Sequence, residues 1–277
     1  MVNELTIISE LEKKTNDVRK LILEMINKAH SGHPGGSFSA AEIVTTLYFH
    51  LMNIDPNNPH WSDRDRFILS KGHACPVLYA NLALRGYFSV AETANLRCLG
   101  SKCQGHPDMN KLAGLDASTG ALGEGLSVGV GMALVGKLDQ KNYIIYVMVG
   151  DGEVQEGQIW EAAMSASKYK LDNLITFLDY NKIQVDGFVE DVMPIEPLKD
   201  KWLSFGWDVQ EIDGHSIKQI ILAVKKAKEF KGKPHIIISN TTKGKGVSFM
   251  ENTPKWHSGA FTKEEYYEAI RELEGKI

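Results

Sequence analysis

Apolar residues recur along the chain with two spacings, one typical of helices and the other of buried strands. In residues 9–29, apolar side chains recur at intervals of three and four, which predicts an amphipathic helix. The helix is expected to stop at HSGHPGG (30–36), because its glycines and Pro34 do not continue a helix. The next expected elements are helices over 39–51, 74–87 and 125–138, a short strand over 66–70, and an irregular segment over about 100–121.

The second half of the chain alternates strands and helices regularly. This order predicts an α/β fold with a parallel sheet and helices on both faces, because parallel neighbours are joined by crossover helices. No linker or domain boundary is visible, so we expect one domain over 1–277, with a C-terminal arm over about 241–277 that ends in a short charged helix. The strands are expected at 142–149, 173–179, 207–212 and 235–240, and the helices between them at 158–170, 198–206 and 216–230.

Composition and charge narrow the possible functions. Of the 277 residues, 43% are hydrophobic and 24% are charged, as in ordinary globular proteins. The 31 basic and 35 acidic residues give a net charge of −4, which argues against nucleic acid or an anionic membrane as a partner. No apolar run approaches the ~20 residues of a membrane span, and the N-terminus lacks a signal pattern. With only three cysteines, a reducing, cytoplasmic location is expected.

Polar and glycine-rich segments follow four of the predicted strands. They are SKGH (70–73), GDGE (150–153), YNKI (180–183) and TTKGKG (241–246). In open parallel sheets, ligands bind beyond the carboxyl ends of the strands, where helix N-termini also point. The sequence therefore predicts a binding site at this edge of the sheet.

Three familiar kinds of site do not fit. GMALVGKL (131–138) has P-loop spacing, but it ends in leucine where that motif needs Ser or Thr, and it lies within a predicted helix. No predicted strand opens onto a G-x-G-x-x-G dinucleotide motif. Cys98, Cys103 and His106 lie close together in the sequence, but their spacing fits no standard zinc site and a fourth ligand is missing.

A divalent cation fits the strand ends better. Asp151 and Asn181 follow successive strands, 30 residues apart, and neighbouring strands lie ~4.8 Å from one another. A carboxylate, an amide oxygen and a backbone carbonyl would leave room for phosphate oxygens, which is the coordination Mg²⁺ favours. Gly150 and Gly152 would let a bulky anion approach the backbone. The alternative is a plain strand-to-helix turn in which Asp151 caps the helix.

These residues resemble a known family. A GDG segment followed about thirty residues later by asparagine, here GDGEVQEGQIWEAAMSASKYKLDNLITFLDYNKIQVDG, is typical of thiamine diphosphate enzymes. Within that group the chain resembles transketolase, specifically its diphosphate-binding half, over nearly its whole length. The segments SGHPGG, LSKGHA, QGHPDM, TGALGEG and KGKGVSFMENTPKWHSG carry the more specific likeness.

The resemblance implies a metal and a cofactor site. Asp151, Asn181 and the backbone carbonyl of Ile183 would bind Mg²⁺ or Ca²⁺, which would hold thiamine diphosphate. The protein would supply placement and electrostatics, while the cofactor would carry out the difficult chemical step. The residues expected to contact the cofactor are His73, Gly120, Ala121, Leu122, Gly152, Glu153, Asn181, Lys243 and His257.

The resemblance also implies three catalytic histidines. His33 and His106 would contact the sugar hydroxyls, and His257 would face both substrate and cofactor. Imidazoles suit this task because they donate, accept and transfer protons near neutral pH. We interpret the remaining candidates as ordinary core or surface residues: His50, His60, His215 and His235.

Transketolases are normally more than twice as long as this chain. Their second domain supplies the glutamate that forms the cofactor ylide and the basic residues that hold the sugar phosphate. We therefore expect the N-terminal subunit of a split transketolase, completed by a separate C-terminal subunit in an α2β2 heterotetramer. The pair would transfer a two-carbon ketol (glycolaldehyde) unit from a ketose phosphate to an aldose phosphate, by default in the pentose phosphate pathway. Glu156 would join a carboxylate network between subunits. The alternative is an acidic residue in the first turn of a helix, where it interacts favourably with the helix dipole.

Alternative functions stay open at this point. The α-subunit of a 2-oxo-acid dehydrogenase shares the GDG…N site and a split architecture. It would typically have a doubled asparagine where this chain has Tyr180-Asn181, and it lacks the three histidine motifs. A non-catalytic thiamine diphosphate-binding homologue is a second alternative, because no visible residue supplies the ylide-forming acid. A split transketolase acting on a rarer sugar is a third.

Overall fold

The computed structural model describes residues 4–185 and 187–275, and its centre is a five-stranded parallel sheet. The strands lie in the order β1-β2-β3-β7-β6, and each neighbouring pair is parallel. The last strand of the chain is therefore inserted between two earlier ones. The sheet consists of β1 (Arg66–Leu69), β2 (Ile145–Gly150), β3 (Leu174–Tyr180), β6 (Asp208–Asp213) and β7 (His235–Asn240).

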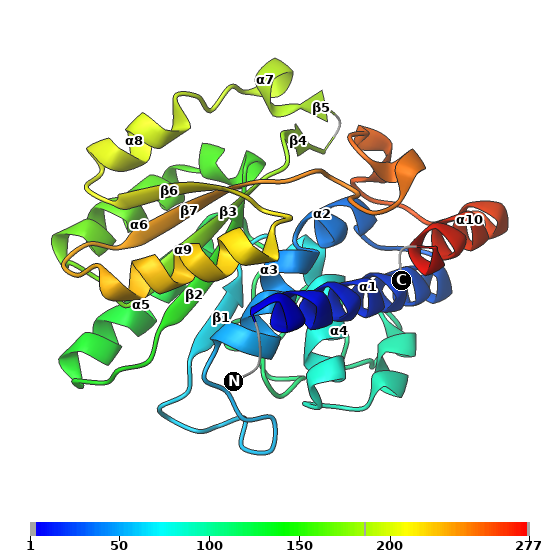
Figure 1. Cartoon of the computed structure of the whole chain (residues 1–277), viewed down its shortest axis with the longest axis horizontal. Coiled ribbons are helices and arrows are strands. Elements are labelled where there is room, and N and C mark those ends of the chain that lie inside the picture. The colour runs from blue at the N-terminus through cyan, green and yellow to red at the C-terminus, as the bar shows by residue number, and fades with distance from the viewer. Residues whose placement is uncertain (1–3, 186, 276–277) are drawn as a thin grey trace.

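Helices surround this sheet (Figure 1). They alternate with the strands of this sheet in the second half of the chain, as the hydrophobic pattern predicted. Those in the described residues are α1 (Glu4–Ala29), α2 (Pro34–Ser39), α3 (Ala41–Thr46), α4 (Cys75–Arg85), α5 (Glu124–Leu138), α6 (Gly157–Lys168), α7 (Val189–Val192), α8 (Leu198–Ser204), α9 (Ile217–Glu229) and α10 (Lys263–Glu274).

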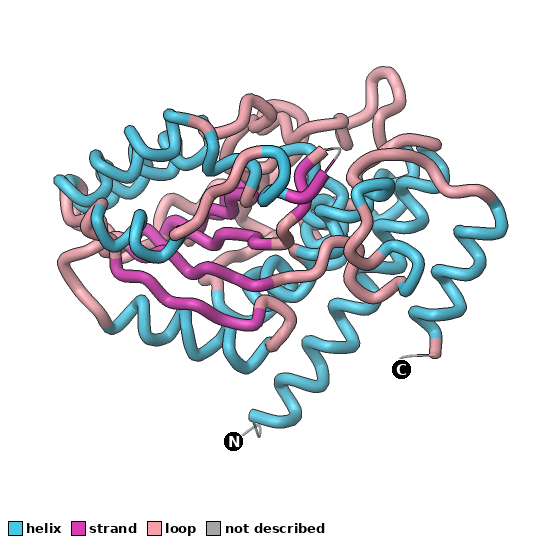
Figure 2. The backbone as a smooth tube through the Cα atoms, turned by 90° about the horizontal axis from the view of Figure 1, so that it is seen from above, coloured by secondary structure: helices cyan, strands magenta, loops and turns pink. Residues whose placement is uncertain are grey.

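The sheet is covered on both faces, and Figure 2 shows its strands running between the helices. Tyr146 and Met148 of β2 point into a core that they share with α1, α3, α4 and α9. Their neighbours Ile145, Val147 and Val149 point into a second core, shared with α5, α6 and α8. Because side chains alternate along a strand, a strand buried on both faces is apolar throughout. The predicted parallel α/β sheet with helices on both faces is confirmed.

The structure differs from the predicted elements at several places, among them the segment SGHPGG. Helix α1 begins at Glu4 and ends at Ala29, where His30 takes a left-handed conformation with φ of 48°. A second helix, α2, then begins directly at Pro34, since proline is tolerated in the first turn of a helix. The helix expected over 39–51 consists of α3 followed by a wider π-helical turn, Leu47–Leu51. The sequence pattern missed α2 and α7, and also a short hairpin, β4 (Ile183–Gln184) with β5 (Gly187–Phe188).

The segment after β7 returns across the molecule toward the N-terminal helix. Trp256 and Phe261 are buried in the core that contains α1. The terminal helix α10 starts with a capping box, in which Thr262 and Glu265 bond each other's backbone N–H groups. It lies beside α1, where Asn16 donates to the carbonyl of Leu273 at 2.8 Å (Figure 1). This return places residues 243–257 next to the sheet edge.

Helix α5 is rich in glycine and apolar residues, and two of its glycines face different surroundings. A methyl group on Gly125 would lie 2.4 Å from the Ser70 hydroxyl oxygen, whereas one on Gly131 would meet nothing within 4 Å. The close approach of Gly125 brings the start of α5 against the end of β1. None of the described helices, α5 included, is both long and apolar enough to cross a membrane.

We expect Gly125→Ala to destabilise the protein by about 1–3 kcal/mol, the range for overpacking a core. The matched variant Gly131→Ala should be neutral or stabilising by up to about 1 kcal/mol, because alanine favours a helix more than glycine does. Urea unfolding of both variants measures the difference. Equal stability of the two would show that Ser70 and the helix move apart without cost.

Candidate active site

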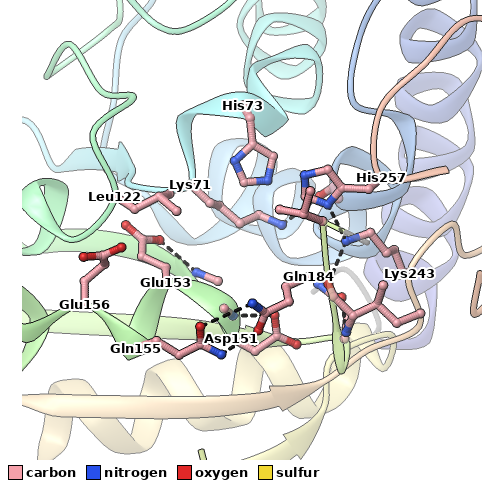
Figure 3. Close-up of a pocket in the computed structure, with 16 residues that line it drawn as sticks. Lys71, His73, Leu122, Asp151, Glu153, Gln155, Glu156, Gln184, Lys243 and His257 are labelled. Atoms are coloured by element: carbon pink, nitrogen blue, oxygen red, sulfur yellow. Dashed lines mark hydrogen bonds between the residues drawn. The ribbon is translucent and has the colours of Figure 1, made fainter. Parts of the chain in front are cut away.

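The carboxyl ends of four strands border one cavity of about 230 Å³ (Figure 3). These are the ends of β1, β2, β3 and β7, which are consecutive neighbours in the sheet. The four polar segments recognised in the sequence therefore meet at one edge. The cavity walls include Lys71 and His73 after β1, Asp151, Gly152 and Glu153 after β2, Asn181, Ile183 and Gln184 after β3, and Lys243 and His257 after β7.

Asp151 and Asn181 directly follow β2 and β3, which are neighbouring strands, as binding of a shared cation would require. The Asp151 carboxylate is only 3% exposed and accepts hydrogen bonds from the backbone N–H groups of Gly152, at 2.8 Å, and Lys182. Asn181 Oδ1 accepts from the N–H of Ile183 at 3.1 Å. Burial raises the pKa of Asp151 to about 6, and the nearby Asp179 carboxylate adds to the rise. The surrounding groups therefore stabilise the negative charge of the Asp151 carboxylate only in part.

Lys243 brings a positive charge close to these oxygens. Its ammonium donates to the carbonyl of Ile183 at 2.8 Å and lies 3.1 Å from His257 Nδ1. Burial lowers the pKa of Lys243 to about 8, although the negative charge of Asp151 opposes this effect. The loop after β7 therefore brings a positive charge to the predicted metal ligands.

A buried ion pair, Lys71–Asp179, forms the floor next to these residues. Lys71 is 2% and Asp179 0% exposed, and their charged groups are in direct contact. The Lys71 ammonium also donates to the carbonyl of Gly36 at 2.8 Å. Burial alone would raise the pKa of Asp179, but Lys71 and hydrogen bonds from neighbouring hydroxyls hold it below its usual value. Sequence reasoning missed this pair, although an aspartate within an otherwise apolar strand is a sign of a buried partner.

Glu153 connects three segments of the cavity wall. Its buried carboxylate accepts from the Ser70 hydroxyl and from the backbone N–H groups of Gly123, at 2.9 Å, and Gly150, at 3.0 Å. Burial raises the pKa of Glu153. These bonds hold the TGALGEG segment against the ends of β1 and β2.

Three of the predicted histidines form a cluster. The ring centroids of His33 and His73 are 5.1 Å apart, those of His33 and His257 5.5 Å, and those of His73 and His257 5.2 Å. Figure 3 shows His73 and His257 side by side above Lys243. Burial is the largest cause that lowers the pKa of each ring, to about 4 for His33, 2 for His73 and 3 for His257. At neutral pH the cluster therefore offers uncharged rings with one N–H each.

His106 and the TGALGEG segment lie at the exposed side of the site. His106 is exposed, and burial together with Arg97 lowers its pKa. A methyl group on Gly120 would lie 3.4 Å from the His106 ring, which places the predicted cofactor segment beside it. Leu122 lines the cavity, whereas Ala121 is exposed. Glu156 lines the cavity as the exposed N-cap residue of α6.

The glycines of SGHPGG explain how His257 reaches the cluster. A methyl group on Gly35 would lie 2.6 Å from the carbonyl oxygen of Trp256, so no side chain fits there. The carbonyl of Gly35 also accepts from the N–H of Gly244 at 3.0 Å. Helix α2 therefore packs directly against the backbone of the segment that carries Lys243 and His257.

His215, which the sequence suggested was an ordinary residue, supports the Lys243 loop. Its Nε2 accepts from the backbone N–H of Thr242 at 2.8 Å, so the proton lies on Nδ1, 3.0 Å from a Glu42 carboxylate oxygen. Glu42 in turn accepts from Arg19 at 2.7 Å. This buried network joins α1 and α3 to the loop after β7. No signal in the sequence connects residues so far apart.

The donor set fits a hard divalent cation carrying a phosphate group. One buried carboxylate, one amide oxygen and one backbone carbonyl lie at adjacent strand ends, next to the Lys243 ammonium. These are oxygen ligands of the kind Mg²⁺ and Ca²⁺ prefer. Within the described residues, no three His, Cys, Asp or Glu side chains form a metal-binding group, so the set depends on the amide and carbonyl oxygens.

Comparisons with known proteins point to one family. Residues 11–275 match the family model for the thiamine diphosphate binding domain of transketolase. The chain is 50% identical over 265 residues to the 6-deoxy-6-sulfo-D-fructose transketolase subunit SqwG of Clostridium sp. (strain MSTE9), with 96% of each chain covered. It is 45% identical over 270 residues to an apulose-4-phosphate transketolase subunit of Phocaeicola vulgatus, covering 98% of this chain and 96% of that relative.

A solved structure of a known protein has the same fold as this chain. The crystal structure of transketolase from Campylobacter jejuni is similar to this chain with a TM-score of 0.91 and 35% sequence identity. The match covers 96% of this chain but 43% of that one, so the chain spans less than half of that transketolase. The chain belongs to the transketolase family and comprises its thiamine diphosphate-binding domain.

Proposed function

We propose that this protein is the cofactor-binding subunit of a two-chain transketolase. It would bind thiamine diphosphate through Mg²⁺ or Ca²⁺ held by Asp151, Asn181 and the carbonyl of Ile183. With a separate C-terminal subunit, it would transfer a two-carbon ketol unit between sugars. The observation that carries the proposal is the position of a buried, poorly compensated Asp151 carboxylate in one cavity with His73 and His257.

The residues of this chain would bind and orient the reactants. Thiamine diphosphate, when bound, supplies the carbon nucleophile that accepts the two-carbon unit. Lys243 would neutralise part of the diphosphate charge, and the backbone around Gly120 and Leu122 would border the cofactor beside Gly152 and Glu153. Uncharged His33, His106 and His257 would donate hydrogen bonds to sugar oxygens and stabilise negative charge that develops on them.

A partner subunit is supported by two observations. The two closely matching relatives are named as subunits, and each is matched over 96% of its own length. On this chain, Val128, Val135 and Leu138 of α5 are exposed, which leaves an apolar helix surface for a partner to cover. We infer an α2β2 assembly in the cytoplasm, in which the partner supplies the cofactor-activating glutamate.

The substrate is proposed to be a ketose with an anionic group at its far end. The relatives' names specify a sulfonated fructose and apulose 4-phosphate, which share that chemistry. The acceptor is an aldose phosphate. A role in the pentose phosphate pathway would use other sugars of this same substrate class.

Reconstitution tests the proposal. The chain is purified alone and with the C-terminal transketolase subunit of the same organism. Both samples are assayed for ketol transfer from xylulose 5-phosphate, 6-deoxy-6-sulfo-D-fructose and apulose 4-phosphate, with Mg²⁺ and thiamine diphosphate. We expect turnover only by the pair.

Other outcomes assign the protein differently. Full activity of the single chain would overturn the two-subunit proposal. Pyruvate decarboxylation by the pair, without ketol transfer, would indicate the 2-oxo-acid dehydrogenase class. Cofactor binding without turnover of any sugar would indicate a non-catalytic homologue.

A further inference from the structure

Arg97 reaches the histidine cluster from the loop before the QGHPDM segment. Its Nη1 donates to the Ser31 hydroxyl at 3.0 Å, and its Nη2 lies 3.5 Å from His33 Nδ1. Within residues 4–185 and 187–275, no Asp or Glu forms an ion pair with it. The guanidinium therefore contacts the site without neutralising an acid.

The fold holds Arg97 in an uncommon backbone conformation. Its φ is 62°, in the left-handed region that residues other than glycine seldom adopt, and its N–H donates to the carbonyl of Cys103 at 2.9 Å. A methyl group on Gly105 would lie 3.3 Å from the guanidinium carbon, so the side chain rests closely against that backbone. Such conformations persist where the surroundings determine them, and they are frequent at functional sites.

The Arg97–His33 contact can be a hydrogen bond in only one of the two neutral tautomers of the ring. A guanidinium has only donors, so His33 Nδ1 can take part in a hydrogen bond with it only as an acceptor. The distance is at the outer limit for a hydrogen bond, as is common for catalytic contacts before substrate binds. We propose that Arg97 is a positioning residue that holds His33 in the tautomer with its proton on Nε2.

Burial and the positive charges nearby keep the His33 ring neutral, so the ring exists as one of two tautomers. Burial is the largest cause of its pKa of about 4, and the positive charge of Arg97 is the next. His106 and Lys243 lower the pKa further, and the rings of His73 and His257 pack against His33. At pH 7 the ring therefore carries one proton.

The consequence for the reaction rests on the proposed function. With Nδ1 bound to Arg97, His33 presents Nε2–H to the substrate and acts as a hydrogen-bond donor to a sugar oxygen. Loss of Arg97 would leave the ring free to expose an acceptor instead, which would no longer donate a hydrogen bond to that oxygen. Arg97 would thus act on the substrate through His33.

Nuclear magnetic resonance on the full chain tests the tautomer directly. The histidines are labelled with ¹⁵N, and His33 is assigned from the resonances that disappear in His33→Gln. We expect a protonated Nε2 and an unprotonated Nδ1 in the wild type at neutral pH. In Arg97→Met, we expect a mixture of tautomers and a higher titration midpoint for His33, because a donor and a positive charge are lost.

The control is Lys102→Met, which removes the same charge from the same loop at an exposed position. It should leave the His33 tautomer unchanged. A wild-type His33 protonated on Nδ1 would overturn the proposal without any result from Arg97→Met. An unchanged tautomer in folded Arg97→Met would overturn it as well.

Kinetics of the reconstituted pair separate this role from the proposed function. We expect Arg97→Met to raise KM for the ketose about threefold to tenfold, as for the loss of one hydrogen bond, with a smaller change in kcat. Equal KM values for Arg97→Met and the wild type would contradict the effect on substrate. An inactive wild-type pair would refute the proposed function, while the tautomer measurement would still decide the role of Arg97.

Discussion

Replacing Asp151 with asparagine is expected to abolish cofactor binding while leaving the fold intact. Asparagine keeps the shape and an oxygen that can accept from a backbone N–H, but it removes the only charge among the predicted metal ligands. The affinity for the cofactor should fall by more than the roughly 10–100-fold that is typical when a residue bonded to a metal ligand, but not to the metal itself, is removed. Calorimetry of the reconstituted pair with Mg²⁺ and thiamine diphosphate measures it. Wild-type affinity in the variant would refute the proposed metal site.

The same substitution should have a different effect on the metal-free chain. The folded-state pKa of Asp151 is raised from 3.8 to about 6, so ionised Asp151 opposes folding. This destabilisation is absent below the unfolded pKa and fully present above the folded one. Relative to the wild type, Asp151→Asn should therefore gain stability as the pH rises from about 4 to 6, by up to about 2–3 kcal/mol. Urea unfolding with a chelator at several pH values tests this sign.

Of the single substitutions considered, removal of the Lys71 charge is expected to lower the free energy of unfolding most. Lys71→Met leaves the Asp179 carboxylate buried without its ion-pair partner, which typically costs about 3–5 kcal/mol. The variant should unfold at a much lower urea concentration than the wild type. A change below about 1 kcal/mol would show that the hydroxyl donors around Asp179 suffice to stabilise its charge.

A double variant distinguishes the lost ion pair from lost packing. In Lys71→Met with Asp179→Asn, the buried charge is gone, but the amide oxygen still accepts from the Ser39 hydroxyl, a bond of 2.6 Å in the wild type. The double variant should recover at least half of the stability lost by Lys71→Met. A loss of stability in the double variant equal to the sum of the losses in Lys71→Met and Asp179→Asn would mean that the two residues are not energetically coupled.

Much of the sheet could be predicted because its strands are buried on both faces. Residues 235–240 form β7 as predicted, and the predicted β2 and β3 differ from the structure by a few residues at their ends. The strand ends also located the cavity, since the carboxyl ends of parallel strands meet at one edge. Uniform burial produces continuous apolar runs, and these are readable without knowledge of tertiary contacts.

Elements that depend on distant contacts could not be predicted from local pattern. Pro34-Gly35-Gly36 looks like a helix breaker, yet it begins helix α2, in which Gly35 lies against the backbone of Trp256. The paired strands β4 and β5 have two residues each, too few to show alternation. The likeness to transketolase pointed to single residues, but it gave no indication of the Lys71–Asp179 pair or of the contact between Arg97 and His33.

The insertion of β7 between β3 and β6 has a consequence for biosynthesis. Asp151 and Asn181 leave the ribosome well before Lys243 and His257, which follow β7 and complete the cavity wall. A nascent chain therefore lacks part of the cavity wall until the segment after β7 has been made. Once that segment is in place, the hydrogen bond from Lys243 to the Ile183 carbonyl puts a positive charge beside the predicted metal ligands in the chain without cofactor.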